Sequence, residues 1–140
     1  MSDYEPVAAI SEAASIIGDR WSPGVIAALL DGPLRYGELM ERLSGIAPNI
    51  LSARLKKLEA DGLVVSSLYS ERPARFEYRL TESGAELSDL LRLLAVWGAR
   101  RLSSHPGPLH AICGTPLQVA WWCPTCATTA SPDEDQPITV

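Results

Sequence analysis

The amino-acid sequence predicts an α+β fold that is mostly α-helical, and three observations lead to this prediction. Apolar residues recur at helical spacing over residues 7–60. Residues 63–69 are strand-like, and residues 75–80 alternate between apolar and polar side chains after a short polar loop. Helical spacing then returns over residues 81–103. A helix, a turn, a second helix and a hairpin, in that order, form a winged helix-turn-helix.

Two helices are expected ahead of the helix-turn-helix. The first covers residues 7–17 and ends at Gly18. The second begins with Ser22 as the N-cap residue and Pro23 at the first helical position, and it ends at residues 31–33. The inward stripes are formed by Ile10, Ala13, Ala14 and Ile17 in the first helix and by Val25, Ile26, Leu29 and Leu30 in the second.

The helix-turn-helix itself is predicted over residues 33–60. A short strand at residues 33–36 leads into a helix over residues 37–43, and residues 44–47 form the turn. Pro48 opens the next helix, which ends near Ala60 because Asp61-Gly62 follows. The inward side chains are Tyr36, Leu39, Met40 and Leu43 in the first helix and Leu51, Leu55 and Leu58 in the second.

A hairpin and a long helix complete the predicted domain. Residues 70–74 form the loop between the two strands, and Thr81 is the expected N-cap of one helix that runs to about Ser103. We expect three parts: a winged helix-turn-helix domain over residues 7–103, a Cys/His extension over residues 109–127 and a disordered acidic tail over residues 128–140.

The charge is unevenly distributed along the chain. The net charge is −5, which by itself is unusual for a protein that binds nucleic acid. Residues 35–79, however, hold eight basic and six acidic residues, whereas the segments on both sides are net negative. Positive charge therefore gathers in the segment with the helix-turn-helix order, and the local sign matters more than the total.

The outer face of the helix over residues 48–60 is small and polar, as a helix in the major groove of DNA requires. We expect Asn49 and Ser52 to contact bases or phosphates, and Lys56 and Lys57 to contact phosphates. Arg54 lies at the flank of this face, where it either contacts phosphate or pairs with Glu38 or Glu59. The candidate DNA-binding residues are Arg35, Pro48, Asn49, Ser52, Arg54, Lys56, Lys57 and, in the hairpin, Arg72 and Arg75.

Several motifs resemble the HxlR family of bacterial winged-helix transcription regulators. They are Ile17-Gly-Asp-Arg-Trp21, Asp31-Gly-Pro-Leu-Arg-Tyr36, Gly45-Ile-Ala-Pro48, Leu51-Ser-Ala-Arg-Leu55, Asp61-Gly-Leu63 and Glu77-Tyr-Arg-Leu-Thr81. The resemblance covers residues 8–100 and implies a homodimer that binds a palindromic operator under the control of a small molecule or a redox signal. Many family members carry a cysteine on the first helix where this chain has Ala8, so a thiol switch at that position is not expected.

The apolar stripe of the last helix also favours a dimer. Leu87, Leu90, Leu91, Leu94 and Trp97 are more apolar than a thin winged domain needs, and the first helix is rich in alanine, which permits close helix approach. The alternative is that these side chains simply cover the domain. Trp21 and Trp97 are candidates for a pocket that binds a small apolar effector, although ordinary packing is the more common role of a tryptophan.

The end of the chain carries a second signal, a pair of potential metal-ligand turns. The ligands would be His110, Cys113, Cys123 and Cys126. Two pairs, each separated by two residues, are typical of a tetrahedral structural zinc site, which predicts a small zinc-ribbon-like tail. The alternatives are three buried or free thiols, or a redox-active Cys-x-x-Cys pair.

Other functions find less support in the sequence. No run of 18 apolar residues occurs, and the acidic N-terminus does not resemble a signal peptide, so a cytoplasmic protein without membrane contact is expected. Two histidines, no clustered acids and no glycine-rich phosphate loop argue against an enzyme. The expected function is a DNA-binding repressor controlled by a small ligand, and the alternative is a winged-helix protein-interaction adaptor with a structural zinc.

Overall fold

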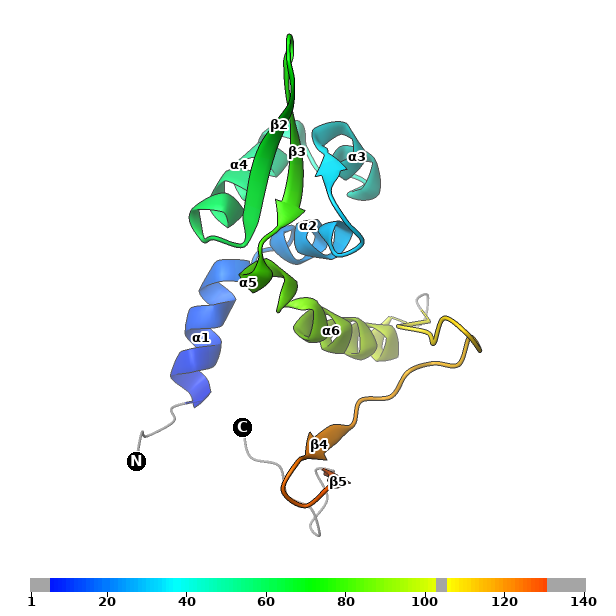
Figure 1. Cartoon of the computed structure of the whole chain (residues 1–140). Helices are drawn as coiled ribbons and strands as arrows, with labels where there is room; N and C mark the ends of the chain where they lie inside the picture. The colour runs from blue at the N-terminus through cyan, green and yellow to red at the C-terminus, as the bar shows by residue number, and fades with distance from the viewer. Residues whose placement is uncertain (1–5, 103–105, 131–140) are drawn as a thin grey trace. The chain divides into compact units, whose positions relative to one another are not determined.

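The structure, a computed structural model, describes residues 6–102 and 106–130. Its elements follow the predicted order of helices, helix-turn-helix and hairpin (Figure 1). The chain divides into two compact units, residues 1–91 and residues 92–140.

Helices α1 (Pro6–Ile17) and α2 (Ser22–Leu29) precede the helix-turn-helix, as predicted. The prediction that Ser22 caps α2 is wrong. The Asp19 carboxylate accepts hydrogen bonds from the amides of Trp21 at 2.9 Å and Ser22 at 3.0 Å, and Ser22 is itself helical. An aspartate can satisfy these free amides from outside the helix because its carboxylate reaches the first turn.

The helix-turn-helix consists of α3 (Tyr36–Arg42) and α4 (Pro48–Ala60). The turn between them contains Gly45, whose positive φ of 88° suits glycine, and Ile46, which is only 5% exposed. All the predicted inward residues of α2, α3 and α4 belong to the core or pack against it. The buried core consists of Val25, Ile26, Leu29, Leu34, Leu39, Leu43, Ile46, Leu51, Leu55, Leu58, Leu63, Val64 and Leu91.

A three-stranded antiparallel sheet follows the helix-turn-helix. Strands β2 (Val64–Glu71) and β3 (Ala74–Leu80) form the hairpin, and β1 (Leu34–Arg35) pairs with β3, so the strand order is β1-β3-β2. The predicted short strand and hairpin are therefore confirmed, with a tighter loop than expected. A register shift lies between Leu68 and Ser70, where Tyr69 interrupts the ladder.

The prediction of one continuous helix after the hairpin is wrong. The chain forms a single turn, α5 (Glu82–Ala85), and then α6 (Ser88–Arg101). Gly84 is buried, and a Cβ built on it would lie 2.1 Å from the Leu63 carbonyl oxygen, so α5 is docked tightly against the start of the hairpin. Thr81 caps α5 as predicted, accepting a hydrogen bond from the Gly84 amide at 3.1 Å. Docking of this turn redirects the chain, which the unbroken apolar spacing does not reveal.

Two short hairpins follow α6 in the second unit. In the first, an isolated bridge joins Leu109 to Pro116. In the second, β4 (Trp121–Cys123) pairs with β5 (Thr128–Ala130), so residues 128–130 form a strand instead of the start of the predicted acidic tail. The rest of that prediction, for residues 131–140, and the predicted helix end at residue 103 lie outside the described residues. Among the described helices, none is long and apolar enough to cross a membrane.

Candidate nucleic-acid interface

The angle between α3 and α4 is held by Tyr36 at the start of α3. Its hydroxyl donates a hydrogen bond to the Pro48 carbonyl oxygen at 2.7 Å and lies 3.2 Å from the Ser52 hydroxyl oxygen. The Arg35 amide just before it donates to the Glu38 carboxylate at 2.7 Å, which caps the first turn of α3. The predicted contact residue Ser52 is thus partly engaged within the chain, and Pro48 begins the helix that carries it.

Helix α4 presents three faces, which follow from its helical spacing of 100° per residue. The first face is buried and consists of Leu51, Leu55 and Leu58. The opposite face carries four residues, Asn49, Ser52, Ala53 and Lys56. Ser52 is partly buried and the other three are exposed. We name these four residues the outer stripe. Their spacing of i, i+3, i+4 and i+7 places them in one row along the helix, as a groove-reading helix requires.

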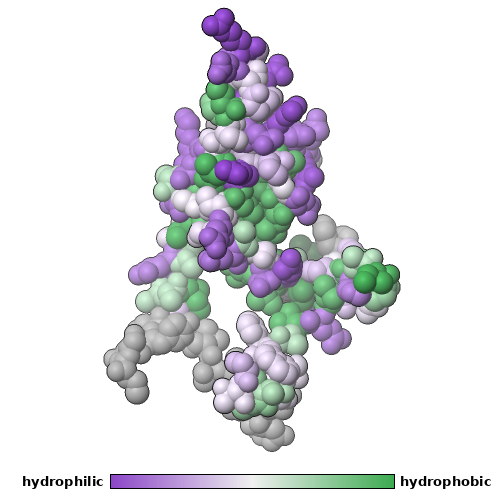
Figure 2. All heavy atoms as spheres, in the orientation of Figure 1, coloured by the Kyte–Doolittle hydropathy of each residue, from purple (hydrophilic) through white to green (hydrophobic). Residues whose placement is uncertain are grey.

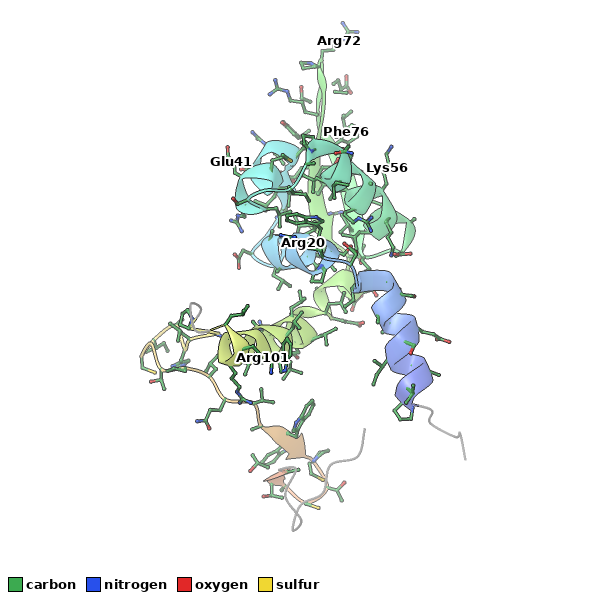
Figure 3. The ribbon with its side chains drawn as sticks, turned by 180° about the vertical axis from the view of Figure 1, so that it is seen from behind. Arg20, Glu41, Lys56, Arg72, Phe76 and Arg101 are labelled. Atoms are coloured by element: carbon green, nitrogen blue, oxygen red, sulfur yellow. The ribbon has the colours of Figure 1, made fainter. Side chains whose placement is uncertain are left out.

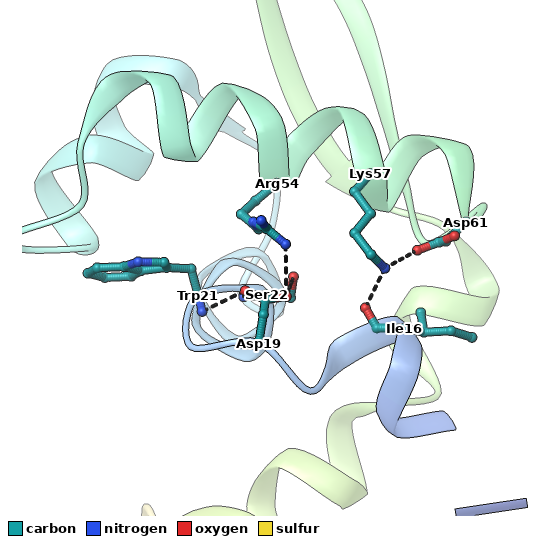
Figure 4. Close-up of polar contacts among 7 residues, drawn as sticks. All are labelled: Ile16, Asp19, Trp21, Ser22, Arg54, Lys57 and Asp61. Atoms are coloured by element: carbon teal, nitrogen blue, oxygen red, sulfur yellow. Dashed lines mark hydrogen bonds and ion pairs between the residues drawn. The ribbon is translucent and has the colours of Figure 1, made fainter. Parts of the chain in front are cut away.

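The third face of α4 binds the chain around the end of α1 (Figure 4). Lys57 Nζ donates to the Ile16 carbonyl oxygen at 2.8 Å and pairs with Asp61 at 2.7 Å. Arg54 pairs with Asp19 at 3.5 Å, a different partner from the two glutamates that the sequence offered. Because both charged groups are engaged within the chain, Arg54 and Lys57 position α4, and their predicted phosphate contacts stay predictions.

Asp19 joins α2 and α4 at one carboxylate. It accepts hydrogen bonds from the Trp21 and Ser22 amides and from the Ser22 hydroxyl, and it pairs with Arg54. Burial acts to raise the pKa of Asp19, but the hydrogen bonds from Ser22 and Trp21 and the charge of Arg54 outweigh it, so the pKa is lowered from its ordinary value of 3.8. The carboxylate therefore stays charged at neutral pH, which keeps both helices joined.

The β2–β3 hairpin carries the predicted basic residues of the wing. Arg72 lies at its far end, and Arg75 is also exposed (Figure 3). Arg35 on β1 reaches across the sheet, and its guanidinium carbon lies 4.3 Å from the centre of the Tyr69 ring. A hollow of about 560 Å³ lies between α3 and the wing, lined by Arg35, Arg75, Tyr69 and Phe76 among others. Glu38 and Glu41 also line it, so this hollow has a mixed charge.

The basic side chains of the outer stripe and wing have no acidic partner among the described residues. Within the described part of the chain, no carboxylate oxygen lies within 4.0 Å of the charged nitrogens of Lys56, Arg72 or Arg75. Hydrophilic atoms gather over the wing at the top of Figure 2. Unpaired cations on adjoining elements leave a local positive charge in a chain whose net charge is −5.

Three residues that hold the elements of the candidate interface together are missing from the DNA-binding residues predicted from the sequence. Asp19, Tyr36 and Tyr69 join elements of the site to one another. An aspartate three residues before a Ser-Pro helix start is a recognisable capping signal that could have identified Asp19. No sequence signal indicates the other two, because their partners are far away along the chain.

The two tryptophans predicted to form an effector pocket lie in different units. Trp21 packs against the core, with Arg20 5.0 Å above its ring, whereas Trp97 is 61% exposed, with Arg101 5.8 Å from its ring. Neither tryptophan lines the hollow beside the wing or the 270 Å³ hollow beside α6. The effector pocket therefore stays a prediction.

The four predicted metal ligands are arranged as two close pairs. His110 Nδ1 lies 3.1 Å from Cys113 Sγ, and the amide and side chain of Cys126 interact with the Cys123 sulfur. Hydrogen bonds that join the Cys113 sulfur to the Thr115 side chain, the Thr115 amide and the His110 ring lower the pKa of Cys113 to about 7. No three His, Cys, Asp or Glu side chains converge on one point within residues 6–102 and 106–130.

Comparison with known proteins gives consistent matches. A family model described as HxlR-like helix-turn-helix matches residues 16–106. An uncharacterized HTH-type transcriptional regulator of Methanothermobacter thermautotrophicus is 37% identical over 98 residues, which cover 70% of this chain and 75% of that protein. A solved structure of a regulator assigned to the MarR family, from Enterococcus faecalis V583, is 36% identical with a TM-score of 0.63, over 74% of this chain and 94% of that one.

Some relatives also match beyond the winged domain. An uncharacterized HTH-type transcriptional regulator of Mycobacterium tuberculosis is 34% identical over 121 residues, covering 84% of this chain and 76% of that protein. Since 84% of 140 residues is about 118 residues, this match continues past α6 into the segment with the first hairpin.

Proposed function

The chain belongs to the HxlR-like helix-turn-helix family of DNA-binding transcription regulators, and from this premise we propose that it is a homodimeric repressor of a palindromic operator. Helix α4 would enter the major groove, and the β2–β3 wing would contact the neighbouring backbone. Release from DNA would be controlled by a small apolar effector.

The outer stripe is the observation that carries this proposal. Asn49 is exposed and can bond an adenine edge, Ala53 allows close approach, and Lys56 lies one turn further along as a phosphate contact. Ser52 shares its hydroxyl with Tyr36, which fixes the side chain before DNA arrives. This row stands opposite the three buried leucines of α4, so the helix can bind DNA without disturbing the core.

Two exposed apolar helix surfaces support the dimer. On α1 no residue is buried, and Val7 and Ile10 are 71% and 56% exposed. On α6, Leu94 and Trp97 are 48% and 61% exposed. Contiguous apolar helix faces of this kind are typical of protein–protein contacts, and a two-fold dimer would separate two copies of α4 by about 34 Å, one turn of DNA.

The proposal of an apolar effector rests on the same exposed aromatic surface. Trp97 offers a large ring beside Leu94 on α6, and the chain has Ala8 on α1, so no thiol can act there. A ligand that binds this surface more tightly in one dimer arrangement than in another would shift the spacing of the two α4 helices.

Fluorescence anisotropy with labelled duplexes tests the DNA-binding proposal. We expect tighter binding to a duplex from the chain's own upstream region than to a shuffled duplex of the same composition, and Asn49→Ala should reduce this preference. Because Asn49 is exposed, its replacement should leave the unfolding temperature unchanged. Equal binding of both duplexes by the wild type would contradict the proposal.

A further inference from the structure

The described segment 106–130 lacks a hydrophobic core. None of its residues is buried, although it carries several large apolar side chains. The most exposed are Ile112 at 90%, Trp122 at 62% and Trp121 at 52%. A segment of this size cannot bury enough apolar surface to hold a fixed shape, and such segments usually depend on a disulfide or a metal. Its three cysteines are free, so a disulfide does not supply this link.

The first hairpin places one histidine and one cysteine side by side. The Leu109–Pro116 bridge closes it, the His110 amide donates to the Thr115 carbonyl oxygen at 2.9 Å, and the Gly114 amide donates to the His110 carbonyl oxygen at 2.8 Å. This tight turn leaves His110 Nδ1 only 3.1 Å from Cys113 Sγ.

The second hairpin repeats this arrangement with two cysteines. Cys123 ends β4, and residues 124–127 turn the chain back into β5. The amides of Cys126 and Thr125 and the Cys126 side chain interact with the Cys123 sulfur. The tip of the second hairpin therefore holds Cys123 and Cys126 close together.

The two turns share an unusual backbone conformation. The residue after the second side chain of each pair has a positive φ, 68° at Gly114 and 51° at Ala127. Among the described residues Ala127 is the only non-glycine residue with a positive φ. An alanine pays a steric penalty there, and such a conformation persists where the surrounding structure requires it. The two hairpins therefore share the same turn conformation, and each has a pair of candidate ligand side chains at its tip.

We propose that the two hairpins together bind one structural Zn²⁺ ion in a tetrahedral site. The ligands are His110 through Nδ1, Cys113, Cys123 and Cys126. Zinc bonds of about 2.3 Å to sulfur and about 2.0 Å to nitrogen place neighbouring ligand atoms about 3.6 Å apart in a tetrahedron. The His110–Cys113 pair at 3.1 Å needs to open only slightly to reach that separation.

Closure of the site requires the two hairpin tips to meet. Nine residues separate Cys113 from Cys123. This linker can span up to about 30 Å when extended, so it is long enough to let the two hairpin tips come together. Because no three ligands already converge, the ion itself brings the pairs together, and its binding is coupled to folding of the segment. The three thiols release their protons to solvent as the ion binds, and the neutral imidazole gives its lone pair. This site does not depend on the proposed DNA binding.

Metal analysis of the purified full chain and titration of the metal-free chain with Co²⁺ test the site. We expect one zinc per chain and, with Co²⁺, the strong visible absorption of a tetrahedral thiolate complex. The variant His110→Ala should weaken Co²⁺ binding at least tenfold. His105→Ala is the matched control, since His105 is the only other histidine, and it should bind as the wild type does.

Two results would overturn the zinc site. One is a chain that holds less than a tenth of an equivalent of zinc and gives no Co²⁺ spectrum, with Cys123 and Cys126 found in a disulfide by mass spectrometry. The other is equal Co²⁺ affinity of the His110→Ala and His105→Ala variants. An unchanged unfolding temperature of the winged domain in each variant would show that any loss of metal binding is a local effect.

Discussion

The adjacent lysines of α4 provide the sharpest test of which face of the helix meets DNA. The same substitution should affect a different property at each of the two positions. Lys56 belongs to the outer stripe and lacks an acidic partner among the described residues, whereas Lys57 binds the Ile16 carbonyl oxygen and Asp61. We therefore expect Lys56→Ala to affect DNA binding and Lys57→Ala to affect stability.

The expected magnitudes follow from these contacts. Each phosphate contact contributes about 0.9 to the slope of log affinity against log salt, so a dimer with Lys56→Ala should lose about 1.8. Lys57→Ala removes the charged hydrogen bond to the Ile16 carbonyl oxygen, which contributes about 1 kcal/mol to stability because it is partly exposed. It also removes the i,i+4 pair with Asp61, which contributes about 0.4 kcal/mol. A loss of that size lowers the unfolding temperature of a domain this large by roughly 5–10 °C.

Both variants can be measured with the same two assays. Anisotropy titrations between about 50 and about 200 mM salt give the slope of log affinity against log salt, and from it the number of phosphate contacts. Circular dichroism gives the unfolding temperature. The face assignment is refuted if Lys57→Ala reduces the salt slope as much as Lys56→Ala does while leaving the unfolding temperature unchanged.

Four further outcomes are expected. Asp19→Ala should destabilise the domain by about 2–3 kcal/mol in denaturant titrations, because α2 loses its cap and the buried Ser22 hydroxyl loses its acceptor. Since the folded pKa of Asp19 is lowered, the charge-dependent part of this difference should be full above pH 3.8 and should be lost as pH falls through the folded pKa. Arg72→Glu with Arg75→Glu should abolish duplex binding in anisotropy titrations, and unchanged binding would favour the adaptor function. Leu94→Glu should give monomers in sedimentation velocity, and a persistent dimer would exclude this face of α6 from the interface. In the metal-free chain with the other cysteines replaced, Cys113 should react with iodoacetamide at a half-maximal rate near pH 7, and a midpoint near 9 would contradict the hydrogen bonding described.

The element order was predictable because periodicity is a local property of the sequence. The apolar stripes of α2, α3 and α4 indicated both the helices and their buried faces, and the alternation of β3 indicated the hairpin. The break between α5 and α6 was not predictable in this way. It depends on contact between Gly84 and the Leu63 carbonyl oxygen, and the leucine spacing continues across the break.

The candidate site was predictable only in part for a similar reason. Helical spacing identified Asn49, Ser52 and Lys56 on one side of α4, and they lie there. Spacing could not separate Lys56 from Lys57, because the Ile16 carbonyl oxygen that binds Lys57 lies 41 residues away along the chain. The partner of a long, flexible cation is set by tertiary structure, which a local pattern does not contain.

Footprinting of the chain on its own upstream DNA, with hydroxyl radicals as the probe, tests the central claim most directly. A homodimer that inserts one α4 helix into each half of a palindromic operator should protect two half-sites about 34 Å apart, centred on a dyad in the sequence. The protection should be lost when Asn49 and Lys56 are replaced by alanine. A single protected site, or equal protection along unrelated DNA, would contradict the account.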